Sequence, residues 1–320
     1  MFKKSFTVVA FTIISLANLL FLASLATGAD FPKKPVRIIV GSAAGGGDDT
    51  ESRGIAPFLE KHLGVKVIIE NQPGAGGKIA FEKFMKVEPD GYSLLSSTFP
   101  RGPIIENMEK VNFRVKDYTP VFAWSRSNQL LVVHADTWKT TNEFIQAAKA
   151  KMLSGGLSGR GSTTHLAGLI AAEAFGIKVN WVPYEGSAGS VTALAGKHLD
   201  FTICLATSAI PLIQAGKLRP LLLFSDDKDL YLPNVTLPKD LGLNITNIPT
   251  TRGVHAPPRT PAGLVKILEQ AFSKAVKEPG FIEWAKNRKM IVHPLTASGY
   301  DKVVKNTYPT IEKFQQLLKE

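Results

Sequence analysis

Short β-branched segments and amphipathic helical patterns alternate from residue 35 onward, and this alternation constrains the fold more than any other feature of the chain. An apolar stretch at Val36–Val40 precedes a helical pattern that runs to Leu63, where Gly64 stands in the position of a C-terminal cap. Two further predicted strands, residues 65–70 and 92–98, flank a second helix. This βαβαβ order predicts a doubly wound parallel sheet, whose ligands bind at the carboxyl ends of its strands.

A second set of alternating elements occupies the middle of the chain. We predict strands at residues 130–133, 179–182, 201–205 and 221–224, and helices at residues 141–152, 165–175, 187–195 and 210–215. Beyond residue 225 come a long loop, an extended segment at 253–256, and helices near 261–277 and 298–318. We therefore assign residues 30–125 and 226–320 to one α/β domain and residues 126–225 to a second, with crossings near 124–128 and 224–227.

The first residues have the pattern of an export signal. Lys3 and Lys4 precede a mostly apolar stretch over residues 6–25, and small residues follow, so cleavage is expected after Ala29. A retained anchor helix is the alternative, because the apolar stretch approaches the length of a membrane span. No cysteine lies near the cleavage point, which argues against a lipid anchor. We expect a free periplasmic protein that does not insert into the membrane after signal removal.

The distribution of charge argues against a nucleic-acid-binding protein, and the cysteine count excludes a protein held by internal disulfides. The formal net charge is +11, but the basic residues are scattered, with pairs such as Lys33–Lys34 and no longer run. Proteins that bind nucleic acid concentrate their basic residues, so small anions are the better partners for this excess charge, and no nucleic acid is expected. The single cysteine, Cys204, excludes an internal disulfide. After removal of the signal the chain is still long enough for two packed cores.

Two glycine-rich loops follow the first two predicted strands. The first is Ala43–Gly47, directly before a helix, and the second spans residues 74–77. Loops of this kind at helix N-termini expose backbone N–H groups that can hold a carboxylate or a phosphate. A dinucleotide-binding fingerprint would require a third glycine at Thr50 or Ile79. We therefore predict a shared anion site, with Asp49 accepting backbone N–H bonds and Asp48 directed toward solvent.

A third loop, residues 158–165, carries hydroxyl groups and a guanidinium at the start of another predicted helix. Its serines and threonines can act as helix caps and nothing more. Three consecutive hydroxyl residues exceed what one cap requires, however, so we predict that this loop forms a second wall for the anion. Arg160 could hold a carboxylate through two parallel hydrogen bonds.

Six stretches of the chain resemble one family, the periplasmic solute-binding proteins of tripartite tricarboxylate transporters, also called the Bug family. The stretches are AAGGGDD at 43–49, ENQPGAGG at 70–77, PDGYSLL at 89–95, GRGSTTHLAG at 159–168, VPYEGSAG at 182–189 and AGKLRPL at 215–221. They occur in family order over nearly the whole mature chain.

The resemblance implies an α/β fold of the two-lobed periplasmic binding protein (type II-like) kind, with a ligand cleft between two doubly wound α/β domains. Such a protein closes on a small organic carboxylate and presents it to a permease of one large and one small subunit; the protein itself is expected to be a monomer. Carried onto this chain, the first-lobe ligand residues are Ser42, Ala43, Ala44, Gly45, Gly46, Gly74, Ala75 and Gly76, with Asp49 as loop support. The second-lobe residues are Ser162, Thr163, Thr164 and His165.

Three positions at the implied site depart from the family pattern. Arg160 stands where relatives often carry Asn, and Arg252 stands where many carry an aromatic residue. Members that bind amino acids carry an Asp for the ligand ammonium at the position of Cys204, which in its apolar strand also fits a buried core residue. We therefore expect a di- or tricarboxylate or an aromatic acid as the ligand.

The sequence favours a binding protein over an enzyme. No Gly-x-Ser-x-Gly motif is present, and Ser162 and His165 have a spacing suited to capping. His165 can be read equally well as a donor to the ligand or as a capped core histidine. The histidines lack metal-ligand spacing, and we expect neither a metal nor a cofactor. An exported carboxylate-processing enzyme and a ligand-sensing module for a receptor kinase remain as alternatives.

Overall fold

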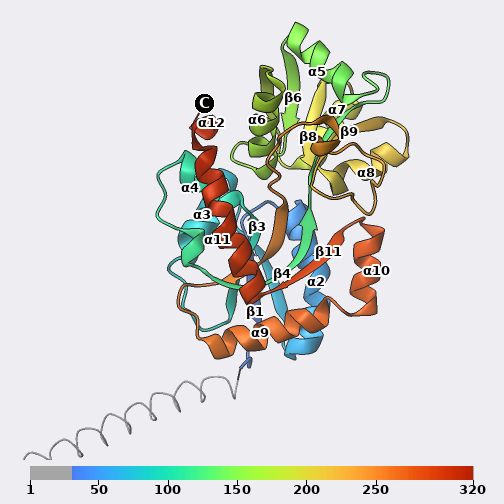
Figure 1. The fold of residues 1–320 in the computed structure, drawn as a ribbon. Coiled ribbons are helices and arrows are strands. Elements are labelled where there is room, and N and C mark those ends of the chain that lie inside the picture. The colour runs from blue at the N-terminus through green and yellow to red at the C-terminus, as the bar shows by residue number, and fades with distance from the viewer. Residues whose placement is uncertain (1–30, 320) are drawn as a thin grey trace, which may run out of the picture.

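The computed structural model describes residues 31–319, so the predicted export signal and its cleavage point lie outside the described residues. The first sheet has the strand order β11-β4-β10-β3-β1-β2, and the second has the order β7-β6-β8-β5-β9. The two sheets belong to two lobes, with the second lobe above the first in Figure 1. Among the described residues, no helix is both long enough and apolar enough to cross a membrane.

The first lobe contains β1 (Val36–Val40), β2 (Val67–Asn71), β3 (Ser93–Phe99), β4 (Thr119–Ser127), β10 (Thr250–Ala256) and β11 (Ile291–Thr296). Its helices are α2 (Gly47–Leu63), α3 (Lys78–Phe84), α4 (Arg101–Met108), α9 (Ala262–Ala275), α10 (Pro279–Asn287) and α11 (Ala297–Lys313), with short 3₁₀ turns at Ala75–Gly77 and Val115–Asp117. The second lobe contains β5 (Gln129–His134), β6 (Leu153–Leu157), β7 (Val179–Pro183), β8 (Phe201–Leu205) and β9 (Leu218–Phe224), with helices α5 (Thr141–Ala150), α6 (Thr163–Phe175), α7 (Ser187–Ala195) and α8 (Ala206–Gln214). A 3₁₀ turn at Pro238–Leu241 follows β9, and α12 (Gln315–Lys319) ends the described chain.

Each lobe is built around a parallel unit of three strands. In the first lobe β1 pairs in parallel with β2 and β3, and in the second β6 pairs in parallel with β7 and β8. Each sheet also contains a strand that runs in the opposite direction. Strand β10 is antiparallel to β3 and β4, and β5 is antiparallel to β8 and β9. The predicted α/β class and two-lobed fold are confirmed, with mixed sheets in both lobes.

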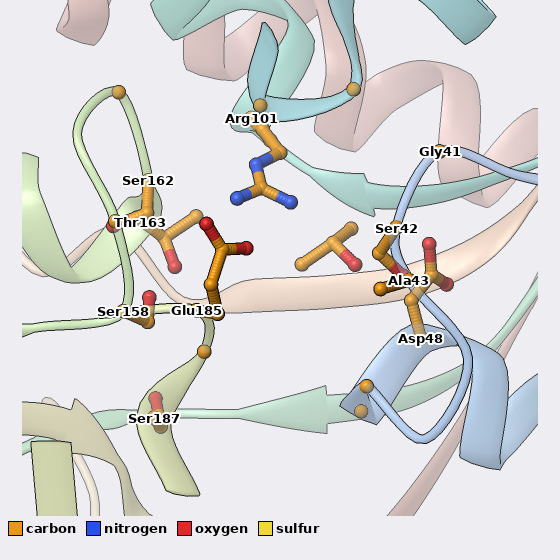
Figure 2. Close-up of a pocket in the computed structure, with 18 of the residues that line it drawn as sticks. Gly41, Ser42, Ala43, Asp48, Arg101, Ser158, Ser162, Thr163, Glu185 and Ser187 are labelled. Carbon is orange, nitrogen blue, oxygen red and sulfur yellow. The ribbon is translucent and has the colours of Figure 1, made fainter. Parts of the chain in front are cut away.

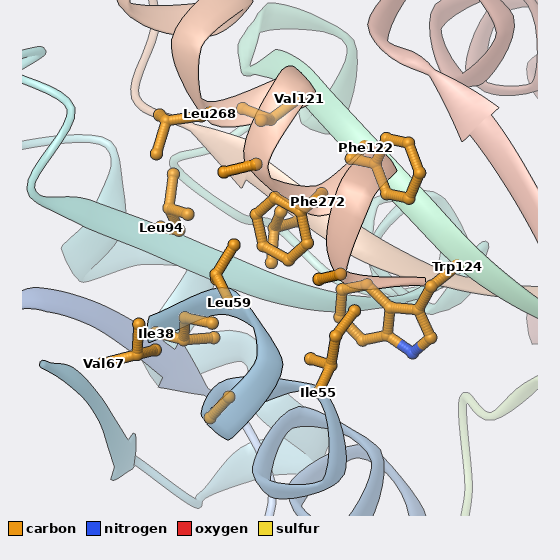
Figure 3. Close-up of a cluster of buried hydrophobic side chains, with 14 of the residues drawn as sticks. Ile38, Ile55, Leu59, Val67, Leu94, Val121, Phe122, Trp124, Leu268 and Phe272 are labelled. Atoms are coloured by element: carbon orange, nitrogen blue, oxygen red, sulfur yellow. The ribbon is translucent and has the colours of Figure 1, made fainter. Parts of the chain in front are cut away.

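The first core lies between the sheet and the helices α2 and α9 (Figure 3). Helix α2 places Ile55, Leu59 and Leu63 at intervals of four residues along one buried face. On the other side, Phe272 of α9 stacks on Trp124, with ring centroids 6.0 Å apart. Burial of each large apolar side chain contributes about 1.5–3 kcal/mol to the stability of the fold. This core therefore fixes β1 and α2, and with them the loop that connects the two.

The chain crosses between the lobes at one short joint and returns at a second. Strand β4 ends in the first sheet at Ser127 and β5 begins in the second at Gln129, so Asn128 is the crossing residue, within the predicted 124–128. The Asn128 amide nitrogen Nδ2 donates to Ser225 Oγ at 3.3 Å. Gln129 Nε2 donates to Thr250 Oγ1 at 3.1 Å. The segments that enter and leave the second lobe therefore meet at one place.

The segment between β9 and β10 differs from the expected domain assignment. Residues 226–249 were assigned to the first domain, but Leu232 and Leu237 pack in a second-lobe core with Leu130 of β5, and Ile245 and Ile248 pack in the other second-lobe core. The return crossing lies at Thr250 rather than at residues 224–227. Isolated apolar residues in an irregular segment give no periodic signal, so only the tertiary structure shows which sheet they cover.

The last helices connect both lobes. Tyr300, Val304 and Tyr308 of α11 belong to a first-lobe core. Farther along, Ile311 and Phe314 join the second-lobe core that contains Leu166 of α6. Figure 1 shows α11 rising along the first lobe and leading into α12 beside α4 and α6. The C-terminal helices are therefore an apolar connection between the lobes as well as a part of the first.

Candidate ligand-binding site

A cavity of about 1480 Å³ lies between the lobes. Its walls are loops that follow β1, β2 and β3 in the first lobe and β6, β7 and β8 in the second (Figure 2). These are the carboxyl ends of the parallel strands in each sheet, where the strand-helix turns of such folds bind ligands. Both predicted glycine loops and the predicted hydroxyl-rich loop line this one cavity.

Asp49 fixes the shape of the first glycine loop from behind. Its Oδ2 accepts a hydrogen bond from Gly45 N at 2.8 Å, while Oδ1 accepts from Arg53 Nε and from Asn71 Nδ2, both at 2.9 Å. Burial raises the pKa of Asp49, but the hydrogen bonds from Gly45, Arg53 and Asn71 outweigh burial and lower it. Asp49 is absent from the cavity lining, so its place in the structure is that of loop support.

Several N–H groups of this loop remain available to a ligand. Among the described residues, the amides of Ala43 and Ala44 have no hydrogen-bond acceptor, and the first turn of α2 leaves its N–H groups without intrahelical partners. Gly46, the N-cap residue, has no side chain to cap the helix. Ser42 adds a buried hydroxyl without a partner, also on the cavity wall. The loop thus presents donors and a helix N-terminus to the cavity.

The second glycine loop packs against the segment that leads into the first. A Cβ atom added at Gly41, two residues before the first loop, would lie 3.3 Å from Gly77 Cα, so the two segments approach at backbone distance. Gly74, Ala75 and Gly76 all have positive φ values, of 132°, 45° and 64°. For Ala75 this conformation is uncommon, and together the three residues turn the second loop along the same cavity wall as the first.

The hydroxyl-rich loop divides into residues that face the cavity and residues that hold the loop. Ser162 is the N-cap of α6, and its Oγ accepts from His165 N at 3.1 Å. Thr164 Oγ1 accepts from Ser158 N at 2.9 Å and lies 3.0 Å from Ser162 Oγ. Of the predicted residues, Arg160, Ser162 and Thr163 line the cavity, whereas Thr164 and His165 are buried behind it.

His165 has the geometry of a capped core histidine. Its Nδ1 accepts a hydrogen bond from Gly161 N at 3.3 Å. Burial, with a smaller effect from the positive charge of Arg160, lowers the pKa of His165 to about 4. The imidazole is therefore neutral near pH 7, and its buried position favours the structural alternative over a donor to the ligand.

Arg252 reaches the cavity wall but its charge is already paired. The guanidinium forms a buried ion pair with Glu51 of α2. Glu51 Oε2 also accepts from Trp124 Nε1 at 3.0 Å and from Ser125 Oγ at 2.6 Å. This network ties α2 to β4 and β10, so Arg252 braces the wall more than it offers charge to a ligand.

Asp48 differs from its expected orientation toward solvent. It is buried on the cavity wall, where Ser96 Oγ of β3 donates to its Oδ1 at 2.6 Å, and Ser52 Oγ lies 3.0 Å from Ser96 Oγ. Burial raises the pKa of Asp48, although the Ser96 bond and the charge of Arg252 oppose that rise. The partner serine lies almost fifty residues away in the sequence, so no local pattern indicated this contact.

Cys204 lies outside the cavity. It is fully buried in a second-lobe core, its Sγ donates weakly to Leu130 O at 3.9 Å, and burial raises the pKa of its thiol. The structure therefore places it as a small apolar core residue, away from the ligand position that the family resemblance implied.

The sequence did not indicate several charged residues of the cavity lining, among them Arg101 and Glu185. Arg101 opens α4 directly after β3, and Glu185 follows β7 (Figure 2). Burial lowers the pKa of Arg101, while the charges of Asp48 and Glu185 raise it. The position of Arg101 just beyond a predicted strand was the available signal. Within residues 31–319 no group of three or more histidine, cysteine or acidic side chains could hold a metal ion.

Comparisons with known proteins agree with this arrangement. The model of the tripartite tricarboxylate transporter family receptor matches residues 52–320. The chain belongs to this receptor family. It is 34% identical over 259 residues to the UPF0065 protein in the gbd 5′ region of Cupriavidus necator, covering 79% of this chain and 78% of the relative.

Solved structures of similar proteins share the two-lobed fold. The periplasmic binding protein BugD superposes with a TM-score of 0.81 at 25% identity, covering 91% of this chain and 99% of BugD. An R. palustris protein solved with adipate also has a TM-score of 0.81 at 25% identity, covering 90% of this chain and 98% of that one. The predicted family is confirmed, and with it the assignment of this receptor to the solute-binding proteins.

Proposed function

We propose that this chain is an exported, periplasmic receptor that captures a small organic carboxylate by cleft closure and delivers it to a tripartite permease of one large and one small subunit. The observation that carries the proposal is the pair of neighbouring glycine loops on the cavity wall. Their unpaired backbone N–H groups, together with the N-terminus of α2, form a compact anion site on the first lobe.

Donors on the second lobe support capture by closure. Ser162 and Thr163 face the cavity opposite the glycine loops, and the chain crosses between the lobes at Asn128 and Thr250. A ligand held from both sides favours the closed form by the difference between its affinities for the closed and open forms. Receptors of this kind bind and release without a chemical step. The cavity wall accordingly needs donors, which the loops supply, rather than an activated nucleophile.

A solved neighbour indicates which anion these donors hold. The R. palustris neighbour was solved with adipate, which supports a carboxylate as the group held by the backbone amides of this chain. We extend that class of ligand to this receptor as part of the proposal. Delivery to a permease follows from membership of the transporter family.

A thermal-shift screen tests the function directly. The mature protein, beginning at residue 30, is heated with a panel of aliphatic and aromatic mono-, di- and tricarboxylates. A ligand at a hundred times its Kd should add about 2.7 kcal/mol to the free energy of unfolding and so raise the melting temperature. NMR of the recovered ligand should show it unchanged. Chemical conversion of the ligand would point to an enzyme, and no shift with any acid would contradict the proposal.

A further inference from the structure

Arg101 is a cation on the cavity wall. Among residues 31–319, no side chain or carbonyl forms a hydrogen bond or an ion pair with its guanidinium. Arg252 on the same wall provides the contrast, because Glu51 neutralises it. Figure 2 shows the Arg101 guanidinium extending into the space between the lobes, with Glu185 facing it.

The charge of Arg101 is available to a ligand in the empty protein. Its guanidinium nitrogens are not among the buried, unpaired side-chain atoms of the described residues, so water can reach them from the cavity and an incoming anion can replace that water. A Cβ added at Gly159 would lie 3.9 Å from Arg101 Nη2, so the guanidinium also lies against the second-lobe loop. Asp48 and Glu185 act on it only at a distance. The guanidinium is therefore free to pair with an anion that enters the cavity.

We infer that Arg101 is the anchor for a second carboxylate of the ligand, so that the receptor takes a dicarboxylate whose first acid group rests on the glycine loops. This inference depends on the proposed function. Figure 2 shows the guanidinium apart from Ser42 and Ala43, toward Glu185 and Ser162. The amide groups and the guanidinium thus provide two separate anion positions, one on the first-lobe loops and one beside the second lobe.

Glu185 opposes this second position. It belongs to the second-lobe loop after β7, and its negative charge faces the same guanidinium. A carboxylate that reaches Arg101 must therefore share the cation with Glu185. Removal of the Arg101 charge and removal of the Glu185 charge should consequently change dicarboxylate binding in opposite directions, which a merely structural role of either residue would not produce.

Calorimetric titration of the mature protein tests the inference. The ligands are the straight-chain α,ω-dicarboxylates from succinate to suberate and the monoamide of each acid. For the dicarboxylate that the native protein binds best, Arg101→Gln should weaken binding about tenfold or more, whereas Glu185→Gln should tighten it. Arg101→Gln should affect the matching monoamide by less than about twofold, because its single carboxylate stays on the amide loops.

Controls separate binding from folding. Arg259→Gln removes an exposed arginine outside the cavity lining and should leave both affinities unchanged. The ligand-free Arg101→Gln protein should melt close to the native protein, because the substitution removes no hydrogen bond or ion pair that the described residues form. Equal weakening of a dicarboxylate and its monoamide would overturn the inference.

Other binding results would distinguish a failure of the second-carboxylate inference from a failure of the proposed function. If the native protein binds monocarboxylates but no dicarboxylate, the second-carboxylate inference fails while the proposed function stands. If no organic acid of any class binds, the proposed function fails first. Tighter dicarboxylate binding by Arg101→Gln would also contradict the inference, since it would mean that the cation repels the bound group.

Discussion

Asp48 and Asp49 are adjacent and chemically identical, yet the structure gives them different surroundings. Asp49 accepts three hydrogen bonds and shapes the glycine loop from outside the cavity. Asp48 lies on the cavity wall, bonded to Ser96. Successive residues of a helix point about 100° apart, so one turn of α2 is enough to separate loop support from cavity lining. For these two residues, the direction in which the side chain points decides its role, and the residue type does not.

The conformation of Gly45 leads to a prediction about the first loop. Its φ of 82° is strained for any β-branched residue, so Gly45→Val should distort the loop and weaken carboxylate binding severely. The strain itself should cost about 1–3 kcal/mol of stability. Titration with the best ligand of the screen measures the loss.

Gly216→Val is the matched control for this substitution. Gly216 has a φ of 70°, has open space around its Cβ position and does not line the cavity. The control should lose comparable stability and keep native affinity. Unchanged affinity in Gly45→Val would remove the loop from the binding site.

The buried histidines predict how stability depends on pH. Burial lowers the pKa of His165 to about 4 and that of His255 to about 3, below the value of about 6.5 for an unfolded histidine. Between these values the unfolded chain binds more protons, so the stability present above pH 6.5 should fall as the pH drops toward 4. Urea unfolding from pH 8 to pH 4 measures the slope.

His165→Asn should reduce that slope. Asparagine can present an oxygen to Gly161 N in place of Nδ1, and it does not titrate. The variant should therefore keep a larger fraction of its pH 8 stability at pH 4.5 than the native protein does. An identical slope in the two proteins would show that His165 contributes no proton-linked stability.

At the scale of elements, the Glu51–Arg252 ion pair holds α2, β4 and β10 together beside the cavity. Glu51 belongs to α2, Arg252 to β10, and the additional donors Trp124 and Ser125 to β4. Removing one partner of a buried pair leaves an uncompensated charge and typically costs about 3–5 kcal/mol. Glu51→Gln should therefore lower the free energy of unfolding by several kcal/mol, as measured by urea denaturation.

The double variant Glu51→Gln with Arg252→Met isolates the pair. It removes the stranded cation while glutamine keeps an oxygen for Trp124 Nε1, so it should recover much of the lost stability. Lack of any recovery would mean that the packing of Arg252, rather than its charge, supports the wall.

Helix α4 shows why some elements escaped prediction. Arg101 is followed by Gly102 and Pro103, residues that weaken a helical pattern, and no helix was expected at Arg101–Met108. Both residues lie in the first turn of α4. The backbone N–H that a proline lacks would have no partner within the helix at that place. Because the helix went unrecognised, so did the placement of Arg101 at its start.

At the scale of the whole molecule, the C-terminal helices determine how freely the lobes can separate. Phe314 packs in the second-lobe core although α11 mostly packs on the first lobe. Phe314→Ala should weaken this connection, make the ligand-free protein more open, and so increase its radius of gyration in small-angle X-ray scattering.

Phe272→Ala is the control, because Phe272 lies wholly within the first-lobe core. Both substitutions should lower stability, each by about 3–5 kcal/mol, but only Phe314→Ala should change the shape of the folded protein. An unchanged radius of gyration in Phe314→Ala would show that other contacts hold the lobes together.

The sequence by itself determined the α/β class, most strand and helix positions, the family, and the loops that meet at the cavity. These follow from local periodicity and from glycine patterns, which are properties of neighbouring residues. Only the tertiary structure decided that residues 226–249 cover the second lobe, that Glu51 neutralises Arg252, and that Arg101 is left without a partner. Contacts of this kind join residues far apart in the chain, and the free energy that selects them arises only when the elements that carry those residues are packed together.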